Sequence, residues 1–139
     1  MIEFHFKSDF LIYNKSDYSD WISRILDSEG FTLGQLDYIF CTDQALLEIN
    51  LEYLAHDTLT DIISFDYSQG KVLSGDIFIS TERVAENAKT FGVSFDNELL
   101  RVMSHGLLHL MGYGDKEEEQ IVQMRAKEEE KIRMFHVEH

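Results

Sequence analysis

The segment from Ser94 to Met111 constrains the fold more than any other part of the chain. Ser94 can cap a helix, and Asp96 falls in the first turn, where the helix dipole favours an anion. From Leu99 onward the segment is apolar on nearly every face, whereas a surface helix keeps a polar face. The segment therefore predicts a buried helix that the rest of the chain must cover.

Two histidines lie on this helix at a spacing that favours metal binding. His105 and His109 are four residues apart, so their side chains point the same way. Gly112 stands where a left-handed residue would end the helix, and Asp115 follows closely enough to supply a carboxylate. Two His and one Asp, with water in the fourth position, make an open zinc site of the catalytic type. A core helix that merely contains two histidines is the simpler alternative, and the glycine and acid that follow argue against it.

The ligand spacing also fits a second class of enzyme, the metzincin peptidases. Those enzymes carry a Glu directly after the first His, where it acts as the general base. The corresponding residue here is Gly106, so a peptidase built on this segment would lack its proton acceptor. Proteolysis is therefore disfavoured.

The charge balance argues against unassisted, non-specific binding to nucleic acid. The net charge is −14, with 13 acidic and 3 basic residues in positions 1–70 and 13 and 9 in positions 71–139. Such binding rests on Lys and Arg that neutralise phosphates. We therefore expect no DNA binding, and an RNA-binding function must rely on a local basic patch, on the metal or on a partner protein.

The length of 139 residues, with no proline, repeat or low-complexity linker, predicts a single domain over residues 1–139. The only cysteine, Cys41, excludes an intramolecular disulfide and fits a buried strand residue in a reducing compartment. There is no basic start followed by an apolar run, and no stretch approaches the roughly 20 apolar residues of a membrane span. We therefore expect a cytoplasmic protein without membrane contact.

Hydrophobic periodicity predicts an α+β fold: one mixed sheet of about four strands with helices packed on it, and the metal site on a buried helix and the loop after it. The expected strands are residues 1–6, 36–42, 60–67 and 72–80, the last two forming a hairpin, and the expected helices are residues 16–28, 43–54, 81–90, 94–111 and 116–137. In the second helix we expect Ala45, Leu46, Ile49 and Tyr53 to face the core. In the last helix we expect Ile121, Met124 and Ile132 on one side, with the charged residues forming a solvated face.

Three stretches occur in a characteristic order along the chain: the Asn50…Tyr53…Asp57…Thr60–Phe65 stretch, the Gly75–Ser80 stretch and the His105–Tyr113 stretch. Together they resemble the YbeY family, metal-dependent single-strand-specific endoribonucleases of bacteria that act in ribosomal RNA maturation and ribosome quality control. The order of elements is similar to that family's over essentially the whole chain. The last stretch is fairly specific when it is combined with the other two.

The resemblance implies one zinc ion per chain, held by three side chains near one end of a cleft. His105 and His109 match two of the family's ligands, and Asp115 stands where the family has a third His. The extra negative charge predicts a weaker Lewis acid. Leu54 stands where the family typically has an Arg suited to gripping phosphate; His56 and Lys71 are nearby replacements to consider.

The role of the middle stretch depends on whether the edge of the 60–67 strand lines the cleft, because its polar side chains then face the metal site. Thr60, Asp61, Ser64 and Asp76 are the candidates to contact substrate or to orient a ligand histidine. A turn or sheet-edge hydrogen bond is an equally good reading of each. His136 and His139 near the end of the chain are further candidates to reach the metal, although a frayed terminus is the simpler expectation.

The function that follows as an expectation is metal-assisted cleavage of RNA phosphodiesters. No side chain stands out as the general base, so beyond a metal-bound water the catalytic groups are unknown, and attack by the RNA 2′-hydroxyl or by water stays open. The alternative from another class is a ribosome-assembly factor that binds the small subunit and uses its metal structurally. Nickel, cobalt and iron also suit a His₂Asp site.

Overall fold

The computed structural model describes residues 1–54 and 60–137. Its strands and helices follow the predicted order, and their bounds are β1 (Ile2–Phe6), α1 (Lys15–Ser28), β2 (Thr32–Cys41), α2 (Asp43–Leu54), β3 (Ile62–Asp66), β4 (Val72–Ser80), α3 (Thr81–Phe91), α4 (Phe95–Leu110) and α5 (Glu118–Val137). The predicted α+β class and the single mixed sheet are confirmed. No helix in the described part of the chain is long and apolar enough to cross a membrane.

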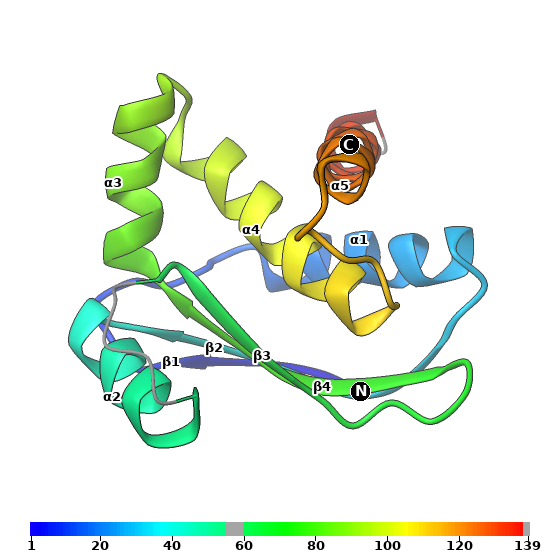
Figure 1. The fold of residues 1–139 in the computed structure, drawn as a ribbon, viewed down its shortest axis with the longest axis horizontal. Helices are drawn as coiled ribbons and strands as arrows, with labels where there is room; N and C mark the ends of the chain where they lie inside the picture. Colours follow the sequence, from blue (N-terminus) through cyan, green and yellow to red (C-terminus); the bar gives the residue numbers. More distant parts are fainter. Residues whose placement is uncertain (55–59, 138–139) are drawn as a thin grey trace.

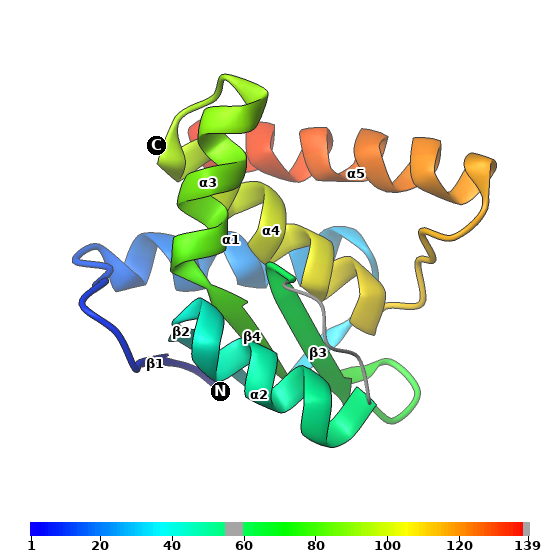
Figure 2. The ribbon, with the colours of Figure 1, turned by 60° about the vertical axis from the view of Figure 1, so that its left-hand side comes forward.

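The four strands form one sheet in the order β1-β2-β4-β3. β1 and β4 each run parallel to β2, and β3 runs antiparallel to β4 as the predicted hairpin. α1 and α4 cover one face of the sheet, α2 lies against the other, and α5 crosses over α1 and α4 on the side away from the sheet (Figure 1, Figure 2). α4 is therefore enclosed between the sheet and α5, as its apolar sequence predicts.

The main core lies between the sheet and the α1–α4 layer. The predicted apolar face of α1 (Tyr18, Trp21, Ile22, Ile25 and Leu26) is buried there. A smaller core lies between the sheet and α2, around Cys41, Leu46 and Ile63. Burial and the neighbouring Asp43 raise the pKa of the Cys41 thiol to about 11, as fits an inert packing residue.

Two sequence-based details are wrong. β2 begins at Thr32, four residues before the predicted start, because a register shift between Leu33 and Leu36 interrupts the alternation that marks a strand. Tyr53 is 63% exposed and packs edge-on against Phe65 instead of joining the core. On the last helix, Ile121 lines the same cavity as Met124, although Ile121 is partly open to solvent and Met124 and Ile132 are buried.

The charged face predicted for the last helix is not fully solvated. The Lys131 side chain is 0% exposed, and its ammonium donates to Glu29 Oε2 at 2.7 Å and to Ser28 Oγ at 3.0 Å. Glu29 also pairs with Lys127 and accepts from the Tyr113 hydroxyl. These contacts fasten α5 to the end of α1, because a buried charge is stable only when it is paired.

Candidate metal and nucleic-acid site

α4 is placed by its ends and by one close approach to the sheet. The Ser94 hydroxyl accepts from the Asn97 amide at 3.1 Å, so the predicted cap is present, and Gly112 has φ +101° directly after the helix. A Cβ on Gly106 would lie 2.7 Å from Ile62 Cδ1 and 3.0 Å from Ile77 Cγ2. The position at which peptidases carry their Glu therefore faces the sheet here, which leaves no room for that side chain.

His105, His109 and Asp115 converge on one point. The two Nε2 atoms are 3.0 Å apart, and Asp115 Oδ2 lies 3.3 Å from His105 Nε2 and 3.2 Å from His109 Nε2. The Nδ1–H group of His109 donates to the Tyr113 carbonyl at 2.9 Å, and that of His105 to Glu128 Oε2 at 2.6 Å. Both Nε2 lone pairs therefore face the carboxylate, an arrangement that is repulsive unless a cation or proton lies between them.

This donor set fits a zinc ion. Zinc–ligand bonds of about 2.0–2.1 Å at tetrahedral angles place ligand atoms roughly 3.3 Å apart, close to the three separations found here. The three residues are partly exposed, so a fourth position can open to solvent. The arrangement can therefore hold a metal ion with an open coordination position.

Glu128 of α5 holds the His105 ring from the side opposite the other two donors, through the ring's Nδ1–H group. Its side chain is 3% exposed, and besides His105 it contacts Arg101 Nη1 at 3.1 Å and Arg125 Nη1 at 3.4 Å. Burial would lower the pKa of His105, but the carboxylates of Glu128, Asp115 and Asp61 outweigh burial and raise it. Glu128 thus fixes the ring orientation of His105 and makes its Nε2 a better electron donor.

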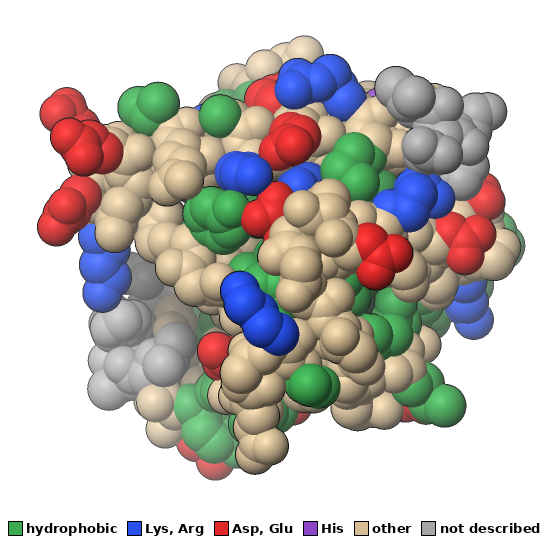
Figure 3. All heavy atoms as spheres, turned by 90° about the vertical axis from the view of Figure 1, so that its right-hand side faces the viewer, with side chains coloured by type: hydrophobic (Ala, Val, Ile, Leu, Met, Phe, Trp, Pro, Cys, Tyr) green, Lys and Arg blue, Asp and Glu red, His purple; other side chains and the backbone are tan. Residues whose placement is uncertain are grey.

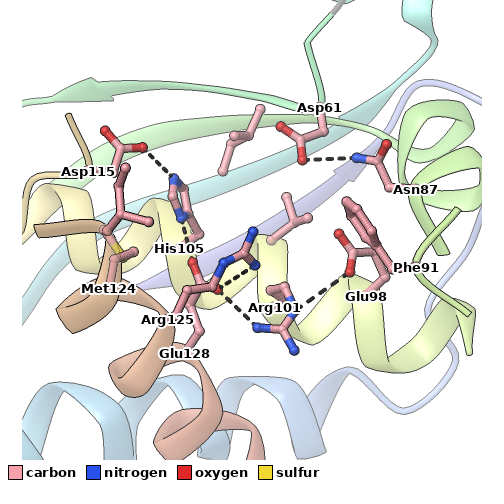
Figure 4. Close-up of a pocket in the computed structure, with 13 residues that line it drawn as sticks. Asp61, Asn87, Phe91, Glu98, Arg101, His105, Asp115, Met124, Arg125 and Glu128 are labelled. Carbon is pink, nitrogen blue, oxygen red and sulfur yellow. Dashed lines mark hydrogen bonds and ion pairs between the residues drawn. The ribbon is translucent and has the colours of Figure 1, made fainter. Parts of the chain in front are cut away.

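A cavity of about 310 Å³ opens beside the cluster, between β3, α3, α4 and α5. Figure 4 shows His105 and Asp115 at one end and Asp61, Asn87, Phe91 and Glu98 at the other. Burial raises the pKa of Asp61, and Asn87 Nδ2 donates to its Oδ2 at 3.3 Å. Burial also raises the pKa of Glu98, although Arg101 acts in the opposite direction. A ligand entering this cavity would meet the histidine cluster and these acids together.

The remaining candidates from the middle stretch divide between the two faces of the sheet. Thr60 donates from its hydroxyl to the Ile62 carbonyl at 3.3 Å, a local contact at the start of β3. Ser64 pairs with Ile77 on the α4 face, and neither Thr60 nor Ser64 is among the cavity-lining residues. Asp76 pairs with Phe65, whose ring contacts α2, so Asp76 lies on the opposite face from the cluster. Among these four candidates, Asp61 alone reaches the cavity.

Lys71, a candidate for phosphate contact, and His136, a candidate to reach the metal, both lie away from the histidine cluster and its cavity. Leu54 is the last residue of α2, and His56, Asp57 and His139 lie outside the described residues. Lys71 stacks 4.5 Å from the Phe31 ring centroid and lines a different hollow, and His136 lines a third hollow with Tyr18 and Phe135. On the described part of the face in Figure 3, Lys and Arg side chains are interspersed with Asp and Glu.

The cations of the cavity come instead from helices α4 and α5. Arg101 is 15% exposed and is engaged by Glu98, Glu128 and Glu129. Arg125 is 59% exposed and contacts Glu128, so its guanidinium can still reach a ligand. Arg101, Arg125 and Glu128 are not among the site residues predicted from the sequence. A signal existed, because Glu128 falls four residues from both Met124 and Ile132 and so shares their buried face.

Comparison with known proteins finds one family that matches nearly the whole chain. The family model described as Endoribonuclease YbeY matches residues 3–136. A relative from Flavobacterium johnsoniae named Endoribonuclease YbeY is 54% identical over 138 residues, covering 99% of each chain. One of the same name from Christiangramia forsetii is 54% identical over 137 residues, covering 99% of this chain and 96% of the relative.

A solved structure supports the fold in the same way. The solution structure of a Thermotoga maritima protein matches with a TM-score of 0.69 and 25% identity, covering 99% of this chain and 91% of the other. The family model and the relatives each span nearly the full length of this chain. The chain therefore belongs to the endoribonuclease YbeY family and is an enzyme of the nuclease class.

Proposed function

We propose that this protein is a zinc-dependent endoribonuclease that cleaves single-stranded RNA in ribosomal RNA maturation and ribosome quality control. It acts as one domain in the cytoplasm, on RNA of the small ribosomal subunit. The observation that carries this proposal is the convergence of three donor atoms, 3.0–3.3 Å apart, at the mouth of a cavity that also holds Arg125. The names of the relatives, Endoribonuclease YbeY, supply the class of substrate.

In this proposal His105, His109 and Asp115 hold the zinc ion. Zinc bound there supplies a Lewis acid for the phosphoryl oxygens of RNA. Glu128 fixes the orientation of the His105 ring. The exposed guanidinium of Arg125 binds phosphate, the role suited to the Arg that the family typically has at the position of Leu54. The Asp115 carboxylate reduces the positive charge at the site, so we expect slower cleavage than with three imidazoles.

The first test is the metal content of untagged protein, measured by elemental analysis. Wild type should contain close to one zinc per chain, and Asp115→Ala should lose most of it. Asp20→Ala, an exposed change on α1, is the matched control and should retain zinc. Zinc retained by Asp115→Ala would overturn the ligand set, and no zinc or other metal in wild type would overturn the metal site.

The second test separates the nuclease from the non-catalytic assembly factor. An unstructured RNA should be cleaved by wild type, protected by a chelator and cleaved again after zinc is restored, whereas His105→Ala and His109→Ala should be inactive. Full cleavage by a metal-free double variant would contradict the proposal. Co-sedimentation with the small subunit that survives zinc removal, without any RNA cleavage, would favour the assembly factor.

A further inference from the structure

The end of the cavity away from the histidines is rich in hydrogen-bond acceptors. We call this end the acidic recess and define it by Asp61, Ile62, Asn87, Phe91, Glu98 and Val102, all of which line the cavity. Asp61 and Glu98 each bring a carboxylate, and Asn87 brings an amide oxygen. The nearby cation Arg101 is already occupied by three carboxylates. A ligand in the recess would therefore be recognised through donors of its own.

One of these acceptors has no hydrogen-bond partner in the described structure. Glu98 is 3% exposed and its Oε1 atom accepts no hydrogen bond; the nearest cation, Arg101 Nε, lies 3.6 Å away. A buried carboxylate oxygen without a donor costs free energy, so such groups in native proteins usually have a role. Glu98, Phe91 and Asp61 line the same cavity, and Figure 4 shows the Glu98 carboxylate with its ion pair to Arg101.

The walls of the recess suit a flat aromatic ligand. Ile62 and Val102 supply apolar surface, and Phe91 at the end of α3 is 56% exposed at the rim. An exposed aromatic ring at the edge of a cavity is the kind of platform on which an unpaired nucleobase stacks. The whole cavity, of which the recess is one end, has a volume of about 310 Å³, at the lower limit of ligand pockets, which run from about 300 to 1,000 Å³.

Among the four RNA bases, guanine matches this recess best. Its Watson–Crick edge places the N1–H and N2–H₂ donors side by side, so a single carboxylate can accept from both. Adenine, cytosine and uracil each have an acceptor directly beside their donor, and that acceptor would face the carboxylate and repel it. We propose that the acidic recess is a nucleobase subsite that selects guanine next to the cleaved phosphate, with Asp61 reading the base edge and Phe91 stacking on the ring. This inference rests on the proposed nuclease function and adds its base preference.

The test uses four RNA oligonucleotides of seven residues, uridine throughout except for G, A, C or U at the centre. Cleavage by the zinc-loaded protein is followed by mass spectrometry of the products. Wild type should cut beside the central G about tenfold faster than beside A, C or U at the same position, which is the discrimination expected of one bidentate contact. Equal cleavage of the four oligonucleotides would overturn the inference and leave the nuclease function standing.

Variants of the recess separate base reading from stacking. Asp61→Asn should lose the guanine preference while still cutting, because an amide presents only one acceptor, and Glu98→Gln should reduce it. Phe91→Leu should slow cleavage of all four oligonucleotides by a similar factor. The exposed changes Asp20→Asn and Tyr13→Leu, both away from the cavity, are the controls and should behave as wild type. A guanine preference that persists in Asp61→Asn would overturn the assignment of Asp61.

Failure of the nuclease function gives a different result. If wild type cuts none of the oligonucleotides, the proposed function fails, and the recess is then tested by binding alone through fluorescence anisotropy of the same four RNAs. Tighter binding of the G oligonucleotide that is lost in Asp61→Asn supports the subsite. Equal binding of all four overturns it.

Discussion

At the scale of single residues, the candidate site depends on a carboxylate that comes from a distant part of the chain. Glu128 lies 23 residues after His105 and accepts its Nδ1–H at 2.6 Å. Arg101 and Arg125 contact the other oxygen of the same carboxylate and hold it in place. The geometry of one ligand is thus set by a side chain on a different helix.

This contact predicts a loss of zinc affinity in Glu128→Gln. The amide retains the shape of Glu128, but it carries no charge, so it is a weaker acceptor for the His105 Nδ1–H and no longer forms ion pairs with Arg101 and Arg125. Zinc should bind about 10- to 100-fold more weakly, measured by competition with a chromogenic chelator. Glu119→Gln, an exposed change on the same helix, is the control and should bind as wild type. Unchanged affinity in Glu128→Gln would mean that the cluster holds its geometry without α5.

At the scale of elements, two contacts position the site: α4 packed closely on the sheet, and α5 fastened to α1. The first depends on Gly106, which allows the helix backbone to approach Ile62 and Ile77. The second depends on the buried ion pair between Lys131 and Glu29. Both contacts lie outside the donor set: the first holds the helix that carries the two histidines, and the second holds the helix that carries Glu128.

Gly106→Ala should destabilise the protein by about 1 kcal/mol or more. Alanine is normally the better helix former by about 1 kcal/mol, but overpacking of a tight core costs about 1–3 kcal/mol. Urea denaturation of the wild type, both single variants and the double variant with Ile62→Val forms the test. The double variant should recover part of the loss, because Ile62→Val removes the nearest atom. A Gly106→Ala protein more stable than wild type would contradict the close approach.

The ion pair predicts an acid-sensitive attachment of α5. Burial opposes the charge of Glu29, but hydrogen bonds from Lys131, Tyr113 and Lys127 outweigh it and lower its pKa to about 2 from a usual 4.5. A carboxyl whose pKa is lower in the folded state stabilises the protein above the unfolded value of 4.5. That contribution, about 3 kcal/mol, declines as the pH falls toward 2.

Glu29→Gln should therefore lose about 3 kcal/mol at pH 7, because the buried Lys131 ammonium loses its closest carboxylate and retains the Ser28 hydroxyl and the longer contact with Glu130, at 3.6 Å. Its remaining stability should depend less on pH between about 4.5 and 2 than that of the wild type. Urea denaturation across this range measures both effects, with the exposed change Asp27→Asn as control. Parallel pH curves for wild type and Glu29→Gln would disprove the assignment.

At the scale of the whole molecule, the net charge of −14 limits how the protein holds RNA. Among the described residues that line the cavity, Arg101 and Arg125 are the cations, and Arg101 is already paired. Binding should then rest on one or two phosphate contacts together with the metal and base stacking, rather than on a broad basic surface.

The expected result is a weak dependence of RNA affinity on salt. For single strands the slope of log K against log salt concentration is about −0.7 for each phosphate contact, so a slope near −1 is expected. Arg125→Gln should weaken binding and bring the slope closer to zero, whereas Lys89→Gln on the exposed side of α3 should change neither. Fluorescence anisotropy across a salt series measures this. A slope steeper than about −3 would require a basic surface that the cavity does not contain.

The sequence by itself determined the order of the elements, the buried helix α4 and the two histidines on one of its faces. These features follow from local rules, since helical periodicity, a Ser cap and a left-handed Gly act within a few residues of each other. Asp115 could also be predicted as a ligand from local sequence, because only a short loop separates it from the end of the helix. The start of β2 was not predicted correctly. The register shift after Leu33 arises from pairing with β4, which a local sequence pattern does not show.

Only the tertiary structure decided what surrounds the histidines. Glu128 and Lys131 belong to a run of charges that resembles a solvated helix face, and they are buried because α5 packs over α1 and α4. Asp61 and Asp76 look alike in sequence, yet Asp61 lies just before β3 and lines the cavity, whereas the pairing of Asp76 with Phe65 places it on the opposite face of the sheet. Such contacts join residues far apart in the chain, and no local pattern specifies them, because they form only when the packing of whole elements brings the side chains together.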